Sequence, residues 1–207
     1  MIARLRGGHN VVSKQSNQPD RRTLKTQRQL KKVFVKLLHD KPIDKITVAE
    51  LARESDIGRG TFYIHFKDVY DLYDSVVTDT VNQFARIFDK FYPRDEDNDF
   101  TPLATQIVTF VVNHSELLEA LTDRGEDIQA FKQINALFIY YVLDAEQIDS
   151  SNAKYRAAVG FASGGLICAI TDWLTTQPQS AVDDLITVIS KSIAAMREVA
   201  QSLKSED

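Results

Sequence analysis

Apolar side chains recur every three to four residues along most of the chain, which is the spacing of amphipathic helices. The first stripe begins near Thr23 and stops before Pro42, a residue that cannot continue a helix. Its members are Leu30, Phe34, Leu37 and Leu38. A shorter stripe follows Thr47, which together with Glu50 has the spacing of a capping box. We therefore predict two helices, separated by a break at Pro42.

The same spacing continues to the C-terminus in longer segments. A further short helix is expected at about 58–65, and longer ones at about 67–91, 102–113, 115–122, 126–145, 151–176 and 181–203. Residues 1–20 are polar and lack any period, which predicts a disordered arm. The pattern thus predicts an all-α fold. A three-helix domain at 21–67 is joined by a long helix to a helical bundle within 68–207.

Charge divides the chain at the same place. Residues 1–67 contain 15 Lys and Arg against 6 Asp and Glu, whereas residues 68–207 contain 10 against 23. A basic N-terminal third points to a polyanionic partner, although a solvated helix face would give the same count. No apolar run reaches about 18 residues, no signal-peptide core is present, and Cys168 is the single cysteine. These features predict a cytoplasmic protein that does not bind a membrane.

The stretch DIGRGTFYIHFKD, residues 56–68, interrupts the helical pattern with two glycines and an aromatic run. Asp56 stands where the chain must turn, and Asp tolerates left-handed backbone better than most residues. In the next helix Phe62 and Phe66 share one face and can enter the core. The other positions are Arg59, Gly60, Thr61, Tyr63, Ile64 and His65. Hydroxyls and Arg reach phosphates and base edges, and Ile can contact a thymine methyl, which predicts a helix-turn-helix.

At these residues a family resemblance is visible. The stretch ITVAELARESDIGRGTFYIHFKDVYDL resembles the DNA-binding domain of TetR-type (tetracycline-repressor-like) transcriptional regulators, and the resemblance covers about residues 23–75. Matching positions are Thr47, Leu51, Ala52, Ile57, Thr61, Phe62, Tyr63, His65, Phe66 and Leu72. Asp56 departs from the usual turn glycine, and Val69 from a lysine that contacts phosphate. The resemblance implies contacts to double-stranded DNA from Thr47, Arg59, Gly60, Thr61, Tyr63, Ile64 and His65, with Lys67 in place of the missing lysine.

The resemblance also implies that the body forms a homodimer through its last two helices. The stretch YRAAVGFASGGLICAITDWL resembles a helix common in one branch of these regulators. We expect the interface at Gly160, Gly164, Cys168, Leu185, Ile189 and Met196. The two glycines would also suit close packing within one subunit. Cys168 fits a small buried hydrophobe better than a redox sensor, which would need a thiol from the second copy.

An effector pocket is the second expectation for the body. Apolar walls with a few polar groups suit a small molecule. We expect a pocket lined by Phe110, His114, Phe131, Asn135, Phe138, Tyr141 and Trp173. A plain aromatic core would explain the same helical spacing. Asn135 stands out because a buried amide must find a hydrogen-bond partner.

Catalysis and metal binding find little support. G-x-S-x-G, H-E-x-x-H and phosphate-loop motifs do not occur, and His114 with Glu116 and Glu119 lacks a second His or Cys at ligand spacing. We expect no catalytic residue, cofactor or metal. The predicted function is a DNA-binding transcriptional regulator, a repressor released by a small-molecule effector. The alternatives are an activator, or a helical module anchored on DNA and regulated by a protein partner.

Overall fold

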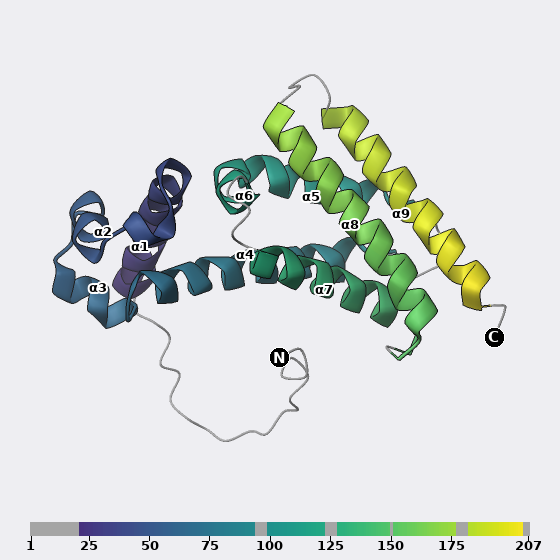
Figure 1. The fold of residues 1–207 in the computed structure, drawn as a ribbon, viewed down its shortest axis with the longest axis horizontal. Helices are drawn as coiled ribbons and strands as arrows, with labels where there is room; N and C mark the ends of the chain where they lie inside the picture. Colours follow the sequence, from purple (N-terminus) through teal and green to yellow (C-terminus); the bar gives the residue numbers. More distant parts are fainter. Residues whose placement is uncertain (1–20, 94–98, 123–127, 150, 177–181, 205–207) are drawn as a thin grey trace.

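The structure, a computed structural model, describes residues 21–93, 99–122, 128–149, 151–176 and 182–204. Across these ranges the chain forms nine α-helices and one turn of 3-10 helix, and they contain no strand (Figure 1). The all-α prediction is confirmed, and the helix bounds agree with the predicted ones to within two residues. The predicted basic arm, residues 1–20, lies outside the described residues.

We call the N-terminal unit the head. It comprises α1 (Arg21–Asp40), the turn η2 (Ile43–Lys45), α2 (Val48–Glu54), α3 (Arg59–His65) and the first part of α4 (Val69–Phe91). Its core holds one contiguous set of buried apolar side chains, which includes Leu30, Phe34, Leu38, Ile46, Leu51, Phe62, Phe66, Val69, Leu72 and Val76. Each of these helices turns one apolar stripe inward, as the three- and four-residue spacing predicts.

We call the C-terminal unit the body. It comprises the rest of α4 with α5 (Thr101–Asn113), α6 (Ser115–Thr122), α7 (Ile128–Ala145), α8 (Ala153–Thr176) and α9 (Val182–Lys204). The helices α8 and α9 pack side by side on the side of the body away from the head (Figure 1). Phe84 and Phe88 of α4 lie in the core of the body, so α4 contributes to both cores.

Head and body meet where α6 packs against α1. Leu117 of α6 is buried in the core of the head, alongside the residues of α1 and α4. An ion pair also joins two helices there, because Lys31 Nζ of α1 lies 2.6 Å from Asp79 Oδ2 of α4. The position of the head is therefore set by contacts with both α4 and α6.

At the other end of the body, a buried ion pair ties several helix ends together. Arg197 Nε lies 2.8 Å from Glu146 Oε1, and less than a tenth of either side chain is exposed. The Tyr92 hydroxyl donates to the same carboxylate at 3.1 Å, and the Arg197 guanidinium lies 5.7 Å from the centre of the Phe100 ring. Tyr92 directly follows α4, Glu146 directly follows α7, Phe100 directly precedes α5, and Arg197 lies within α9.

The helix α8 is apolar along most of its length. Within the described ranges it is the one helix that has the length and composition to cross a membrane. Long core helices of soluble proteins meet the same criterion, so this is weak evidence for a span. In the structure α8 packs against α7 and α9 of the same subunit.

Candidate nucleic-acid interface

The turn between α2 and α3 is built as the sequence predicts. Asp56 has a φ of 55°, in the left-handed region, and takes the place that glycine usually fills. Its N–H donates to Arg53 O at 3.1 Å, and the N–H of Ile57 donates to Ala52 O at 2.9 Å. This pair of hydrogen bonds is the Schellman pattern that ends a helix. The turn thus orients α3 relative to α2.

The helix α3 is anchored by Phe62 and by Phe66, the residue that directly follows it. Phe62 and Phe66 are buried in the core of the head, with ring centres 5.9 Å apart. On the opposite side Tyr63 is 59% exposed and Ile64 is 79% exposed. An isoleucine that is this exposed gains nothing from the fold of a single subunit. The face therefore suits contact with another molecule.

The remaining predicted residues of α3 surround this apolar pair. Arg59 and Gly60 are exposed, and Thr61 and His65 are half-buried. A Cβ atom placed on Gly60 would meet no atom within 4 Å, so no packing within the subunit requires glycine here. The open backbone at this position allows a close approach from outside.

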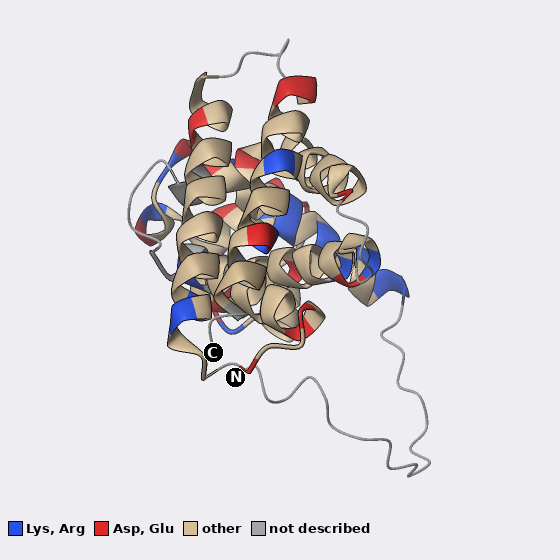
Figure 2. Cartoon of the chain, turned by 90° about the vertical axis from the view of Figure 1, so that its right-hand side faces the viewer, with Lys and Arg blue, Asp and Glu red and all other residues tan. Residues whose placement is uncertain are grey.

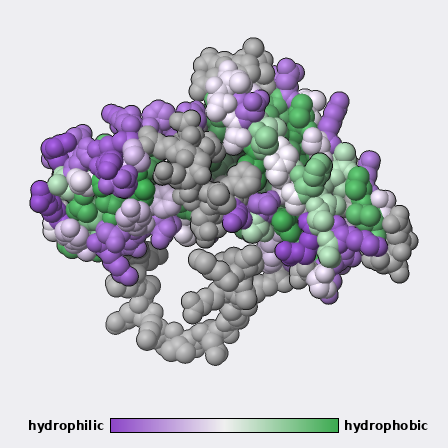
Figure 3. All heavy atoms as spheres, in the orientation of Figure 1, coloured by the Kyte–Doolittle hydropathy of each residue, from purple (hydrophilic) through white to green (hydrophobic). Residues whose placement is uncertain are grey.

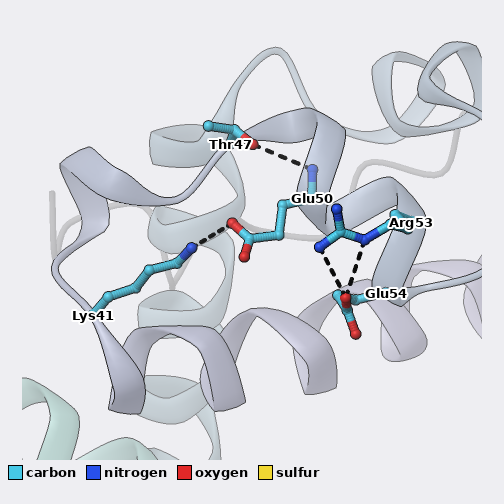
Figure 4. Close-up of polar contacts among 5 residues, drawn as sticks. All are labelled: Lys41, Thr47, Glu50, Arg53 and Glu54. Carbon is cyan, nitrogen blue, oxygen red and sulfur yellow. Dashed lines mark hydrogen bonds and ion pairs between the residues drawn. The ribbon is translucent and has the colours of Figure 1, made fainter.

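The start of α2 is held by a polar network that joins it to the preceding loop (Figure 4). The Thr47 side chain caps the helix by accepting from the Glu50 N–H at 3.2 Å. Lys41 Nζ lies 2.5 Å from Glu50 Oε2, and this hydrogen bond holds the pKa of Glu50 below its usual value. Arg53 pairs with its neighbour Glu54 at 3.1 Å. The Thr47 hydroxyl hydrogen remains able to donate to a phosphate.

The start of α4 explains the departure at Val69. Val69 is buried in the core of the head, so no charged side chain is presented at this position. Asp68 caps α4 by accepting from the Asp71 N–H at 2.8 Å, and Asp71 accepts in return from the Lys67 N–H at 2.8 Å. The Lys67 side chain is exposed. It is the cation closest in sequence to the missing lysine, and its role in phosphate contact stays a prediction.

Some residues predicted for an effector pocket contact one another, and others contact side chains of α4. Phe110 stacks on His114, with ring centres 4.2 Å apart, and His114 Nδ1 lies 2.8 Å from Phe110 O. Phe138 and Tyr141 both contact the ring of Phe88, at 5.1 and 5.8 Å. These rings occupy the space between α4, α5 and α7. The side chain of Phe131 lies outside the described residues.

Two predicted pocket residues carry polar groups on the inner side of α7 and α8. Asn135 accepts a hydrogen bond from the hydroxyl of Ser163, so its amide oxygen has the partner that burial requires. Trp173 is half-buried, and its Nε1–H finds no acceptor within the described parts of the chain. The pocket as a whole stays a prediction.

The residues predicted for a dimer interface are placed on two different faces. Leu185, Ile189 and Met196 turn into the core of the body. Cys168 is exposed, in contrast to the buried position expected for it. A Cβ on Gly160 would touch Ile139 Cδ1 at 3.7 Å, which places this glycine against α7 of the same subunit. A Cβ on Gly164 would meet nothing within 4 Å.

The large apolar residues exposed on α8 and α9 are Phe161, Val188 and Val199, and 86% of Phe161 is exposed. In the view of Figure 2, α8 and α9 face the viewer and carry few charged residues. Hydrophobic residues gather over this part of the body, whereas the surface of the head is mostly hydrophilic (Figure 3). Val188 and Val199 share the three- and four-residue apolar spacing of Leu185 and Ile189 on α9, whereas sequence reasoning did not single out Phe161.

The turn at Asp56 and the exposed face of α3 together form a helix-turn-helix, a motif with which many proteins bind DNA. Residues 34–76 match the model of the family described as bacterial regulatory proteins, tetR family. An uncharacterized HTH-type transcriptional regulator from Bacillus subtilis (strain 168), YxbF, is 26% identical over 109 residues, which are 51% of this chain. The aligned residues cover only 29% of the length of that relative.

Solved structures share the fold over most of the chain. A tetR-family transcriptional regulator from Streptomyces coelicolor aligns with a TM-score of 0.68 and 18% identity, over 88% of this chain and 85% of the other. The transcriptional regulator FadR from Bacillus subtilis, solved in complex with stearoyl-CoA, aligns with a TM-score of 0.52 and 12% identity, over 80% and 98%. The family match thus covers most of the head, and the solved structures show that the chain as a whole has the fold of these regulators.

Proposed function

We propose that this protein is a homodimeric repressor that binds a pseudo-palindromic DNA operator through α3 and is released by a small-molecule effector. The observation that carries the DNA-binding part is the outward face of α3, where Tyr63 and Ile64 are exposed beside an open Gly60. Its mixture of a hydroxyl, an apolar side chain and a cation suits phosphates and base edges in a major groove. Regulators of this type are not typically enzymes.

The test uses a DNA fragment selected from random sequence by the wild-type protein. Tyr63→Ala and Thr61→Ala should each weaken binding by about 1–3 kcal/mol, the loss expected for a good base contact. Arg59→Ala should also reduce the salt dependence of binding if the guanidinium holds a phosphate. Fluorescence anisotropy at several salt concentrations measures both quantities.

Lys191→Ala is the matched control for this test, because Lys191 is an exposed cation on α9 in the body. It should change neither the affinity nor its salt dependence. If all three α3 variants bind the fragment as tightly as the wild type does, α3 is not the DNA-binding face.

A two-fold dimer would place two copies of α3 on successive major grooves, which doubles the length of DNA that is read. The exposed apolar residues Phe161, Val188 and Val199 support an interface on the outer faces of α8 and α9. Gly164 and Cys168 lie on the same helix as Phe161. Cys168 is exposed, and a Cβ on Gly164 would contact no other atom of the subunit within 4 Å. Leu185, Ile189 and Met196 would then support this interface from within.

Replacing Gly164 by Leu tests the interface. The added side chain meets no atom of its own subunit near the Cβ position, so the fold should be retained. In a dimer it should overpack the contact and weaken association by about 1–3 kcal/mol. Sedimentation velocity measures association, and circular dichroism confirms the helix content. Ala136→Leu, at an exposed position of α7, is the control; equal dimerisation of both variants would place the interface elsewhere.

We infer release by an effector from analogy with regulators of this type. Binding of a small molecule in the body can change the separation of the two heads, so that both copies of α3 no longer fit the DNA. The rings of Phe110, Phe138 and Tyr141 would line such a site, with Asn135 and Trp173 as its polar groups. We expect the protein to act in the cytoplasm, where DNA is accessible. An activator, or a body controlled by a protein partner, remains the alternative, and reporter transcription with and without the protein separates activation from repression.

A further inference from the structure

A cleft of about 570 Å³ lies between the head and the body, in the range of small-molecule sites. One wall is α1, with Lys31, Lys32 and Val35, and the floor is α4, from Val76 to Gln83. The other wall is the turn from α5 to α6, residues 112–117. Of the residues predicted for an effector pocket, His114 alone lines this cleft, which lies where α6 packs beside α1 (Figure 1).

The deep part of the cleft is apolar. Val76 and Leu117 are buried, Val35 is half-buried, and Val112 is 44% exposed. An exposed valine beside two buried apolar side chains forms an uncovered apolar surface inside a concave site. Burying it against an apolar group of a ligand would be favourable.

The rim of the cleft is polar and includes two lysines and two carboxylates. Lys31 uses Asp79 Oδ2 at 2.6 Å and Ser75 O at 3.4 Å, which leaves one of its three ammonium hydrogens. Lys32 is exposed and has no ion-pair partner among the described residues. Asp79 is already engaged by Lys31, so Glu116 is the one carboxylate of the lining without a cation beside it in the described ranges.

We propose that this cleft binds a small amphipathic anion, a molecule with an apolar body and a carboxylate or sulfonate end. The apolar body would contact Val35, Val76 and Val112, and the anionic end would pair with Lys32 and the remaining Lys31 hydrogen. Such a ligand bridges α1 of the head and the α5–α6 turn of the body. Binding of this anion does not depend on DNA binding and can be measured on the free protein.

The probe is 1-anilinonaphthalene-8-sulfonate, and its uncharged analogue N-phenyl-1-naphthylamine has the same aromatic body without the sulfonate. Both are titrated by fluorescence with direct excitation of the probe. Lys32→Glu should weaken the sulfonate about tenfold or more, as expected for a charged hydrogen bond, and should leave the analogue unchanged. Glu116→Gln should strengthen the sulfonate, because it removes a like charge. Val112→Trp should fill the cleft and weaken both probes at least tenfold.

Two control variants share the chemistry without lining the cleft. Lys36→Glu removes an exposed lysine from the next turn of α1, and Ala136→Trp enlarges an exposed alanine on α7. Both should leave the two affinities unchanged. The proposal is overturned if Lys36→Glu has the same effect as Lys32→Glu, or if Val112→Trp binds both probes as the wild type does. Loss of the analogue but not of the sulfonate on Lys32→Glu would overturn the assignment of the anionic end.

Discussion

The head and the body are both helical, yet the sequence pattern predicts which side chains are buried much better in the head than in the body. In the head, α3 presents to solvent the side chains that its pattern predicts, Tyr63 and Ile64, and buries Phe62 and Phe66. In the body, Leu185 and Ile189 of α9, which were predicted at a dimer interface, are buried in the core of the single subunit. The large apolar residues exposed on α8 and α9 are Phe161, Val188 and Val199.

The difference comes from how many faces of each helix are apolar. The helix α3 has one apolar face and packs against one core, so periodicity decides which side is inside. The helix α8 carries apolar or small residues around most of its circumference and touches α6, α7 and α9. Its sequence does not reveal which neighbour covers which face. Uniform hydrophobicity is thus informative about burial in general and uninformative about partners.

The largest effects are expected from substitutions that disrupt each of the two cores separately. Phe62→Ala removes a fully buried ring from the small core of the head, and Phe88→Ala removes a nearly fully buried one from the larger core of the body. Each should cost about 3–5 kcal/mol of unfolding free energy. Because the core of the head has few members, Phe62→Ala should also abolish DNA binding, whereas Phe88→Ala should leave a folded head at low temperature.

Urea unfolding followed by circular dichroism gives the free energies, and anisotropy on the selected DNA fragment gives the binding. If Phe62→Ala binds DNA as the wild type does, the head does not depend on this core. Equal loss of DNA binding in both variants would mean that the head and the body unfold as one unit.

The buried ion pair sharpens the comparison, since the described residues of the head contain no ion pair that is equally buried. Arg197→Met leaves the Glu146 carboxylate buried without its guanidinium, which should destabilise the protein by about 3–5 kcal/mol. The double variant Arg197→Met with Glu146→Leu removes both charges and should recover most of this loss. Thermal unfolding of the single and double variants gives the coupling. A double variant no more stable than Arg197→Met would show that the pair is not what stabilises this end of the body.

Alkaline pH should give the smallest effect and should act on the body. Burial raises the pKa of Tyr155 to about 12, and burial beside Glu146 raises the pKa of Tyr92 as well. An unfolded tyrosine has a pKa of about 10. Above pH 10 the unfolded chain therefore releases protons that the folded chain retains, and the unfolding free energy should fall as the pH rises towards 12.

Tyr155→Phe should reduce this slope. The Tyr155 hydroxyl has no hydrogen-bond partner among the described residues, so the variant should keep its stability at neutral pH. Tyr70→Phe, at an exposed position of α4, is the control and should leave the slope unchanged. Urea unfolding at pH 8, 10 and 11 measures it, and identical slopes for the wild type and Tyr155→Phe would contradict the role given to Tyr155.

The sequence by itself determined the helices, the turn at Asp56 and the outward face of α3. These features depend on neighbours within about five residues: the cap at Thr47, the left-handed Asp56, and the four-residue spacing of Phe62 and Phe66. Local backbone geometry decides them, and local patterns therefore predict them. The family pattern adds the role of the face, because it lies in the same short segment, 34–76.

The tertiary structure decided what lies between distant segments. Glu146 and Arg197 are 51 residues apart in the chain, Lys31 and Asp79 are 48 apart, and Leu117 of the body enters the core of the head. The cleft beside α1 and the inward turn of Leu185 also depend on which helices become neighbours. The spacing of apolar residues predicts which face of a helix a side chain lies on. Only the packing of whole helices decides which neighbouring residues that face contacts.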